Sequence, residues 1–254
     1  MTQDTFISHL IELRDRMLRG LLVVTIVFLC LFPWAKDLYT LMAQPLLAVL
    51  PKGGQMIATD VVGVFLVPLK VTALVAVMIT MPYLLYQMWA FVAPGLYAHE
   101  KRLVLPLVLT SSVLFLTGMA FAYFAVFPLA FRVLASFAPD GVAWMTDIDK
   151  YFSFVLGMFV VFGVTFEIPV AVVLLVRMGM VRVEQLTEAR PYVIVGAFVV
   201  AAVLTPPDVV SQLLLAFPLW LLYEAGIIAA RMIGTSSAAN DDAESAADAA
   251  PKHD

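Results

Sequence analysis

The chain of 254 residues is 63% hydrophobic and 13% charged, with a formal net charge of −4 and a mean hydropathy of +0.97. Soluble globular chains are about 45–50% apolar and about 25% charged, so the composition excludes an ordinary soluble domain. We expect residues 1–233 to form a membrane domain. Residues 234–254, rich in Ala, Ser and acidic residues, are expected to form a disordered acidic tail.

The segment before the first apolar run is typical of an amphipathic helix. Apolar residues recur there at helical spacing, namely Phe6, Leu10, Leu13 and Met17. Glu12 and Arg16 stand at i,i+4, as do Asp15 and Arg19, and such pairs stabilise a helix by roughly 0.2–0.5 kcal/mol each. Stabilisation of the helix would by itself explain why these four residues stand at this spacing.

Six apolar stretches follow, and a stretch of about 20 residues can cross a bilayer core about 30 Å thick. The predicted spans are residues 18–34, 64–89, 103–127, 151–177, 192–204 and 209–230. The predicted fold class is therefore all-α, a polytopic membrane protein with six transmembrane helices.

Prolines lie within or at the ends of most spans, and each interior proline removes a backbone donor and favours a bend. They are Pro33, Pro68, Pro82, Pro106, Pro128, Pro169 and Pro218. Bent helices of unequal length indicate a cupped arrangement more than a tight bundle. The outward loop 34–63, which contains Pro45, is expected to include a short interfacial helix.

Spans five and six are predicted to be short. Residues 191–204 would form a helix of roughly 21 Å, less than the thickness of the bilayer core. In span six, Gln212 and Glu224 bound the uninterrupted apolar stretch, and Glu224 is expected to reach interfacial water. A short pair of helices must thin the bilayer locally or lie behind longer neighbours.

Lysine and arginine are distributed unevenly, with ten on the side of both termini and five on the other side. This bias places both termini in the cytoplasm, together with Glu12 and with Glu100 in the loop after the second span. A guanidinium is a rigid fork of donors that matches a carboxylate, so two carboxylates on one surface could bind two adjacent arginines. Each acid also has basic neighbours, and simple charge balance stays open.

Glu167 lies in the middle of the fourth span, where ionisable groups are costly and rare. Pro169 leaves the Thr165 carbonyl without its helical donor, which weakens the helix beside the acid. Two interpretations fit this position: a structural, hydrogen-bonded carboxyl, and a polar site linked to proton movement.

The outward turn between spans five and six is Thr205-Pro206-Pro207-Asp208, and Gln212 follows one turn later. Thr205, Asp208 and Gln212 could form a polar cluster near the outer leaflet. Capping of the sixth span by Asp208 is a simpler explanation of the acid, and both remain open.

Motifs of catalysis, phosphate binding and metal binding are absent from the sequence, including Gly-x-Ser-x-Gly and His-Glu-x-x-His. The single cysteine, Cys30, excludes an internal disulfide and a two-cysteine metal site. No small-residue cleavage site follows the first apolar run, so a cleavable signal is not expected. We expect no catalytic residue, metal, cofactor or nucleic-acid partner.

Two motifs flank the first two spans on the predicted cytoplasmic side: Ser8-His9-Leu10-x-Glu12-Leu13-Arg14-x-Arg16 and Tyr97-x-x-His99-Glu100-Lys101-Arg102. Further characteristic stretches are residues 91–96, 118–124, 166–169, 190–192 and 204–208. In this order they resemble the TatC family, the multi-span subunit of the twin-arginine protein translocase. The resemblance covers the chain from about Phe6 to Arg231 and leaves out only the tail.

The resemblance implies a six-span protein of the cytoplasmic (inner) membrane that is not an enzyme. It would recognise signal peptides bearing paired arginines on folded cargo, and work with single-span partners similar to TatA and TatB. Transport would be driven by the proton-motive force without nucleotide. We also expect contact with membrane lipid and a homo-oligomeric complex.

By analogy with the family, Glu12 and Glu100 are the arginine-binding acids, on a surface shared with Arg14 and Arg16. Further positions that match the family are of two kinds. Pro45, Glu167 and Asp208 match functionally sensitive positions, and Thr205 and Gln212 match a polar site where a partner helix docks.

Two other functions stay open from the residues alone. A proton-coupled transporter of small solutes would use Glu167, and such proteins commonly have paired halves with matching broken helices. Spans one to three and four to six differ in length and motif, which disfavours that interpretation. A membrane scaffold without a cargo site is the third possibility.

Overall fold

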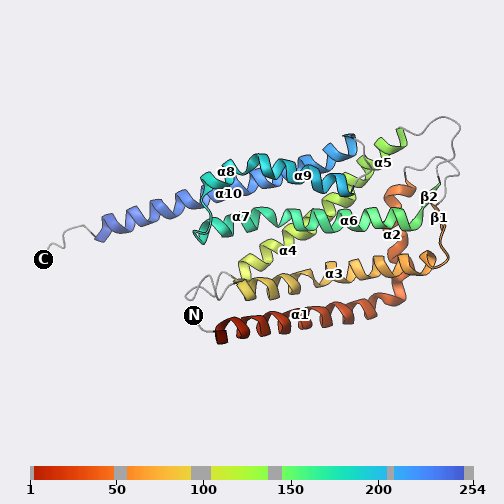
Figure 1. Cartoon of the computed structure of the whole chain (residues 1–254), viewed down its shortest axis with the longest axis horizontal. Coiled ribbons are helices and arrows are strands. Elements are labelled where there is room, and N and C mark those ends of the chain that lie inside the picture. The colour runs from red at the N-terminus through yellow and green to blue at the C-terminus, as the bar shows by residue number, and fades with distance from the viewer. Residues whose placement is uncertain (1–2, 49–55, 93–103, 137–144, 205–208, 249–254) are drawn as a thin grey trace.

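The computed structural model describes residues 3–48, 56–92, 104–136, 145–204 and 209–248 (Figure 1). Helices dominate these segments, which confirms the all-α class. In chain order the elements are α1 (Gln3–Leu31), the 3-10 helix η1 (Phe32–Trp34), α2 (Ala35–Leu47), β1 (Met56–Ile57), α3 (Gly63–Val92), α4 (Val104–Phe121), the π-helix η4 (Ala122–Val126), α5 (Phe127–Ser136), β2 (Thr146–Asp147), α6 (Ile148–Phe166), α7 (Ile168–Arg177), α8 (Val183–Glu188), α9 (Arg190–Leu204) and α10 (Val209–Asp248).

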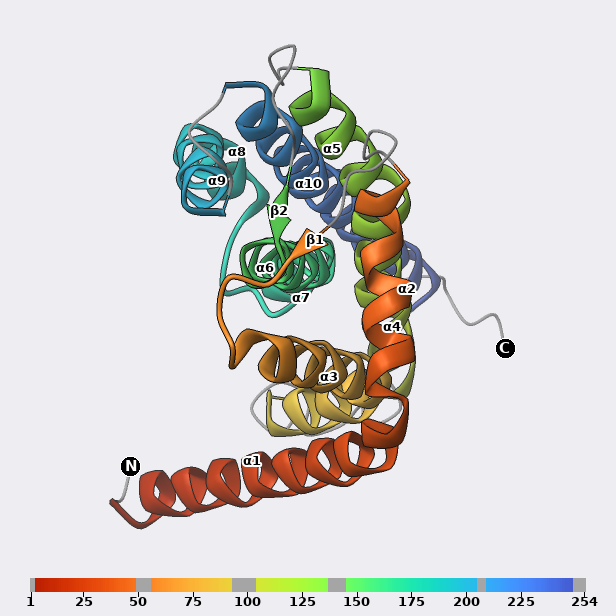
Figure 2. The ribbon, with the colours of Figure 1, turned by 90° about the vertical axis from the view of Figure 1, so that its right-hand side faces the viewer.

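The long helices form an open, curved succession. α1 packs on α3, α3 on α4, α4 on α6, α7 on α10, and α10 on α9. α1 and α9 therefore lie at the two ends of the succession, with α6 and α7 between α3 and α10 (Figure 2). This arrangement agrees with the predicted cupped shape. We call the side where α1 begins and α10 ends the terminal side, and the side with α2 and the strands the opposite side (Figure 1).

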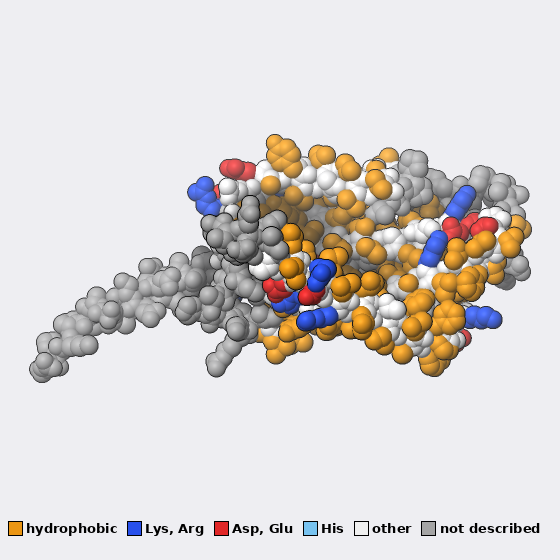
Figure 3. Space-filling view, turned by 60° about the horizontal axis from the view of Figure 1, so that its bottom comes forward, with side chains coloured by type: hydrophobic (Ala, Val, Ile, Leu, Met, Phe, Trp, Pro, Cys, Tyr) orange, Lys and Arg blue, Asp and Glu red, His pale blue; other side chains and the backbone are white. Residues whose placement is uncertain are grey.

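The apolar segments correspond to the six predicted spans. Five of them are long and apolar enough to cross a membrane: Leu10–Leu47, Gly63–Phe91, Leu105–Ser136, Ile148–Arg177 and Gln212–Met232. The shorter apolar helix Arg190–Val203 corresponds to the fifth predicted span. Apolar side chains cover much of the surface, while charged side chains gather toward the two ends of the molecule (Figure 3).

The last two spans differ from each other. With 15 residues, α9 is about 22 Å long, so the prediction of a short fifth span is confirmed. The sixth apolar section, Gln212–Met232, has 21 residues and is not short. Its length was underestimated because Glu224 does not end it but is paired inside it. α10 continues to Asp248 through most of the predicted disordered tail, whose many alanines favour helix.

Prolines coincide with several changes in the helices, as predicted. Pro33 lies in η1, where the chain turns from α1 into α2. Pro128 follows the π-helix η4, and Pro169 follows the break between α6 and α7. The other prolines of the predicted spans lie in uninterrupted helices and do not break them: Pro68 and Pro82 in α3, Pro106 in the first turn of α4, and Pro218 in α10.

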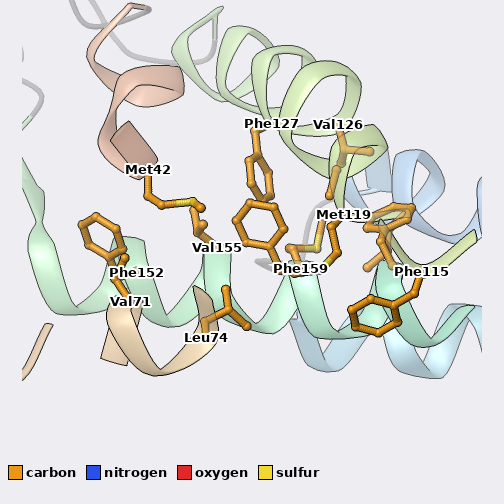
Figure 4. Close-up of a cluster of buried hydrophobic side chains, with 14 of the residues drawn as sticks. Met42, Val71, Leu74, Phe115, Met119, Val126, Phe127, Phe152, Val155 and Phe159 are labelled. Atoms are coloured by element: carbon orange, nitrogen blue, oxygen red, sulfur yellow. The ribbon is translucent and has the colours of Figure 1, made fainter. Parts of the chain in front are cut away.

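α6 is the centre of the core. Its large buried residues lie along one helical face: Ile148, Tyr151, Phe152, Val155, Met158, Phe159 and Phe162. Phe159 meets Phe127 edge-on, with ring centroids 5.1 Å apart, beside Met119 and Val155 (Figure 4). Such edge-to-face pairs add to the stabilisation from burial.

Two glycines let α4 and α6 approach closely. A Cβ atom at Gly118 would lie 2.6 Å from the Phe162 carbonyl oxygen. A Cβ atom at Gly163 would lie 2.6 Å from the ring of Phe115. Small residues at such contacts are typical of helix packing in membranes, where close approach replaces the hydrophobic effect.

On the opposite side, a small polar clamp ties the start of α6 to the chain before α3. β1 and β2 pair in parallel, with Met56 beside Thr146. The Thr59 amide and hydroxyl both donate to the Asp147 carboxylate, which also accepts from the backbone N–H groups of Asp149 and Lys150 and so caps α6. The Thr59 hydroxyl and the Lys150 N–H lower the pKa of Asp147 to about 2.

We expect the stabilisation from Asp147 to disappear as the pH falls from about 4 to about 2. The folded carboxyl, with its lowered pKa, stays ionised at pH values where the unfolded one, with a pKa near 3.8, takes up a proton. Thermal unfolding of the purified protein at about pH 5 and about pH 2.5 measures the loss. Asp147→Asn should show a smaller loss, and an equal loss in both proteins would contradict the assignment.

Candidate functional site

The predicted site residues are distributed over both sides and the interior of the molecule. Those in described segments are Glu12, Arg14, Arg16, Pro45, Glu167 and Gln212. Glu100, Thr205 and Asp208 lie outside the described residues. The approach of Glu100 to Glu12 therefore stays a prediction.

On the terminal side, Glu12 is bound to a guanidinium of its own chain. Arg16, one turn later on α1, donates to Glu12 Oε1 from Nε at 2.9 Å and from Nη2 at 2.6 Å. The Arg16 Nη1 donates to Oε1 of Gln87 in α3 at 3.3 Å, and the Gln87 amide donates to the Tyr83 hydroxyl at 2.6 Å. The predicted Glu12–Arg16 pair is confirmed, and it is tied to a second helix.

Arg14 lies on a different face of α1 and is exposed. Its Nε and Nη2 donate to Asp15 Oδ1 at 3.0 and 2.8 Å. Asp15 thus pairs with its neighbour Arg14, and the predicted pair with Arg19 is wrong. A contact between sequence neighbours is not expected from helical i,i+4 spacing. The structure brings Glu12 and Arg16 together and leaves Arg14 outside that contact.

Glu167 occupies the break between α6 and α7. Its N–H bonds the Val164 carbonyl at 3.0 Å, and its own carbonyl accepts from Ala171 at 2.9 Å. The predicted weakening of the helix beside Pro169 is confirmed. Both carboxyl oxygens are buried and have no hydrogen-bond partner among the described residues. The described contacts therefore do not support a hydrogen-bonded, purely structural carboxyl.

Ser111 of α4 is the polar side chain beside Glu167, although the two groups do not complete a hydrogen bond. The Trp89 indole in α3 donates to Ser111 Oγ at 3.1 Å. α3, α4 and the α6–α7 break each contribute one member of this polar strip. It crosses a core that is mostly apolar.

Arg190, at the start of α9, and Glu224, in α10, form an ion pair that was not predicted. Arg190 Nη2 donates to Glu224 Oε2 at 2.7 Å, and Nε lies 2.6 Å from Oε1. Glu224 is only 17% exposed, so the expectation that it reaches interfacial water is wrong. The sequence signal that could have predicted this pair was two opposite charges toward the terminal side of consecutive spans.

Neighbouring contacts fix the same end of α10 to α8. The Tyr223 hydroxyl donates to the Leu186 carbonyl at 2.8 Å. Arg231 Nη2 donates to Thr187 Oγ1 at 3.1 Å. Together with the Arg190 pair, these bonds hold α8, α9 and α10 in one arrangement on the terminal side.

Toward the opposite side, Gln212 joins α10 to α9. Its amide nitrogen donates to the Phe198 carbonyl at 3.3 Å. Ala197 and Ala201 are buried on α9, and their small size lets α10 approach. Because Thr205 and Asp208 are not described, the polar cluster as a whole stays a prediction.

Pro45 is buried inside α2 and creates a hydrogen-bond acceptor. Proline has no N–H, so the carbonyl four residues earlier, on Leu41, lacks its helical donor. The Tyr123 hydroxyl in η4 donates to that carbonyl at 2.9 Å. The Tyr151 hydroxyl in α6 donates to the next carbonyl, on Met42, also at 2.9 Å. Two tyrosines thereby anchor α2 to the membrane domain.

No cluster of three or more His, Cys, Asp or Glu side chains that could hold a metal ion occurs in the part of the chain that the structure describes. The described groups are suited to binding: a half-exposed carboxylate that accepts from a guanidinium, and a buried carboxyl without a hydrogen-bond partner among the described residues.

The family model described as Sec-independent protein translocase protein (TatC) matches residues 8–218. The chain belongs to the TatC family. The Sec-independent protein translocase protein TatC of Escherichia coli (strain K12) is 54% identical over 231 residues, which cover 90% of each chain. That of Haemophilus influenzae (strain ATCC 51907 / DSM 11121 / KW20 / Rd) is 52% identical, over 89% of this chain and 88% of its own length.

Solved structures agree with the family assignment. A crystal structure of the twin-arginine translocase receptor TatC matches with a TM-score of 0.81 and 38% identity, over 88% of this chain and 98% of that one. The resemblance drawn from the motifs is confirmed, and the chain is an integral membrane protein. The family match includes Glu12, Pro45, Glu167 and Gln212, whereas Glu224 lies beyond it.

Replacing Tyr123 with phenylalanine should destabilise this TatC protein by roughly 1 kcal/mol, because the Leu41 carbonyl would lose its donor while the ring stays in place. Thermal unfolding in detergent measures the change. Tyr39→Phe is the matched control, since the Tyr39 ring packs on Phe152 but its hydroxyl makes no hydrogen bond among the described contacts. Equal effects of the two changes would argue against the proline-created acceptor.

Glu224→Gln should destabilise the protein by about 1–2 kcal/mol, because Arg190 would keep its charge in a partly buried place without its partner. The double variant Arg190→Gln/Glu224→Gln should recover part of that loss. Lys70→Gln, which breaks an ion pair whose side chains are 44% and 45% exposed, should change the unfolding temperature little. A Glu224→Gln protein as stable as the unmodified one would refute this role of the pair.

Proposed function

We propose that the chain is the signal-peptide receptor and core subunit of a twin-arginine translocase that exports folded proteins across the cytoplasmic membrane. The family is one of protein translocases, and a related structure is described as a twin-arginine translocase receptor. The observation that carries the receptor role is the contact of Glu12 with two nitrogens of one guanidinium. An arginine in a signal peptide presents the same group.

In this proposal Glu12 and Glu100 each bind one arginine of the pair, on a surface shared with Arg14 and Arg16. Glu12 suits the role because its side chain is 39% exposed, so a peptide can reach it. Partial burial also strengthens a charge-assisted hydrogen bond relative to one in open water. A carboxylate prefers the guanidinium fork to the single charge of a lysine.

The terminal side faces the cytoplasm in this proposal, with both termini there and the protein in the inner membrane. The excess of Lys and Arg on that side supports the orientation. A receptor for precursor proteins must present its site on the side where they are made, and Glu12 lies on that side.

The partners that we propose are single-span proteins similar to TatA and TatB, further copies of the chain, and membrane lipid. Thr205 and Gln212 would form the docking site for a partner helix. α9 suits such a role because it packs mainly on α10 and exposes Val195, Val199 and Val203. Its length of about 22 Å would also thin the bilayer beside it.

Glu167, Asp208 and Pro45 would act in the translocation step, which the proton-motive force drives without nucleotide, cofactor or catalytic residue. Support comes from the unpaired oxygens of Glu167 and from the anchoring of α2 at Pro45. An unpaired intramembrane acid would also suit a proton-coupled solute transporter, but the family's role is the movement of proteins.

Binding of a paired-arginine peptide to the purified protein tests the receptor role. Glu12→Gln and Glu100→Gln should each weaken binding by about 10- to 100-fold, since each removes charge-assisted hydrogen bonds. Glu184→Gln removes the same charge from exposed α8 on the same side and should have little effect. Binding that survives both substitutions unchanged would reject the site.

A further inference from the structure

We propose that Arg16 is a resident competitor for the arginine-binding carboxylate of Glu12, which a signal peptide must displace. This inference rests on the proposed function of Glu12 and reverses the role given to Arg16 by analogy. In the structure Arg16 places Nε and Nη2 on Glu12 Oε1, at 2.9 and 2.6 Å. The arginine of a bound peptide would make contacts of this same kind.

The surroundings of Arg16 differ from those of an ordinary helix-surface pair. Only 21% of its side chain is exposed, and its third nitrogen donates to Gln87 on another helix. Gln87 is itself buried and held by the Tyr83 hydroxyl. A displaced Arg16 therefore keeps an acceptor at Gln87, which lowers the cost of releasing Glu12.

Competition within the chain has a defined thermodynamic effect. A resident partner lowers the apparent affinity of every ligand that needs Glu12 by the same factor, because the free site is populated only part of the time. The ratio of the affinities for arginine and lysine peptides is unchanged, but every peptide needs a higher concentration to occupy the site. Weak ligands such as paired-lysine peptides then fail to occupy the site at concentrations where paired arginines succeed.

Three substitutions that each change the net charge by −1 separate competition from general electrostatics. Arg16→Gln removes the competitor. Gln87→Glu keeps Arg16 but offers it a second carboxylate, placed where Gln87 Oε1 now accepts from Nη1 at 3.3 Å. Arg19→Gln, two turns from Glu12 on the exposed surface of α1, removes a charge only.

Fluorescence anisotropy with labelled paired-arginine and paired-lysine peptides, on the full chain in nanodiscs, is the measurement. Arg16→Gln and Gln87→Glu should each tighten the binding of both peptides by about fivefold more than Arg19→Gln does. A change of about fivefold is the size expected when a partly exposed ion pair no longer competes. Arg16→Lys keeps the charge but offers a single donor group, and it should give a smaller gain. Weaker or unchanged binding in Arg16→Gln and Gln87→Glu would overturn the proposal.

Glu12→Gln, measured in the same assay, separates failure of this inference from failure of the receptor role. If Glu12→Gln weakens binding and Arg16→Gln weakens it too, Arg16 supports the site and only the competition is wrong. If Glu12→Gln leaves binding unchanged, the receptor site itself is wrong. In the double variant Glu12→Gln/Arg16→Gln the gain from Arg16→Gln should vanish, because the competition acts through Glu12.

Discussion

The architecture depends on one constraint: inside a membrane, polar groups must find their partners within the protein. A proline in a helix breaks this rule locally, since it frees a carbonyl four residues earlier. Pro45 does so in α2, and the freed Leu41 carbonyl is met by Tyr123 from a distant segment. The hydrogen bond that α2 loses at Pro45 is thus replaced by a contact between α2 and η4, which holds α2 in place.

Charged groups follow the same constraint. Glu224 is tolerated within an apolar helix because Arg190 reaches it from the start of α9. On the terminal side Glu12, only partly exposed, is held by Arg16. In the proposed function this acid is already paired before its ligand arrives. Recognition of a peptide arginine would then exchange one guanidinium for another, and the measured affinity would be the difference between the two contacts.

The limits of prediction from the sequence follow from the range of the interactions. Hydropathy locates the spans because it is a local property, and the 15 residues of α9 revealed a short helix directly. The Glu12–Arg16 pair was found because its members lie one turn apart. Gln87, which holds Arg16, is 71 residues away, and Tyr123 is 82 residues from Leu41. Glu224 was misjudged because its charge was considered without Arg190, 34 residues earlier.

Glu167 stands apart from the other two acids, because no guanidinium reaches it among the described residues and its oxygens are unpaired. Its polar neighbour Ser111 is held by Trp89. Trp89 lies two residues from Gln87, which contacts Arg16. The end of α3 therefore carries two of these contacts: Gln87 accepts from the Arg16 guanidinium that holds Glu12, and Trp89 donates to the serine beside Glu167.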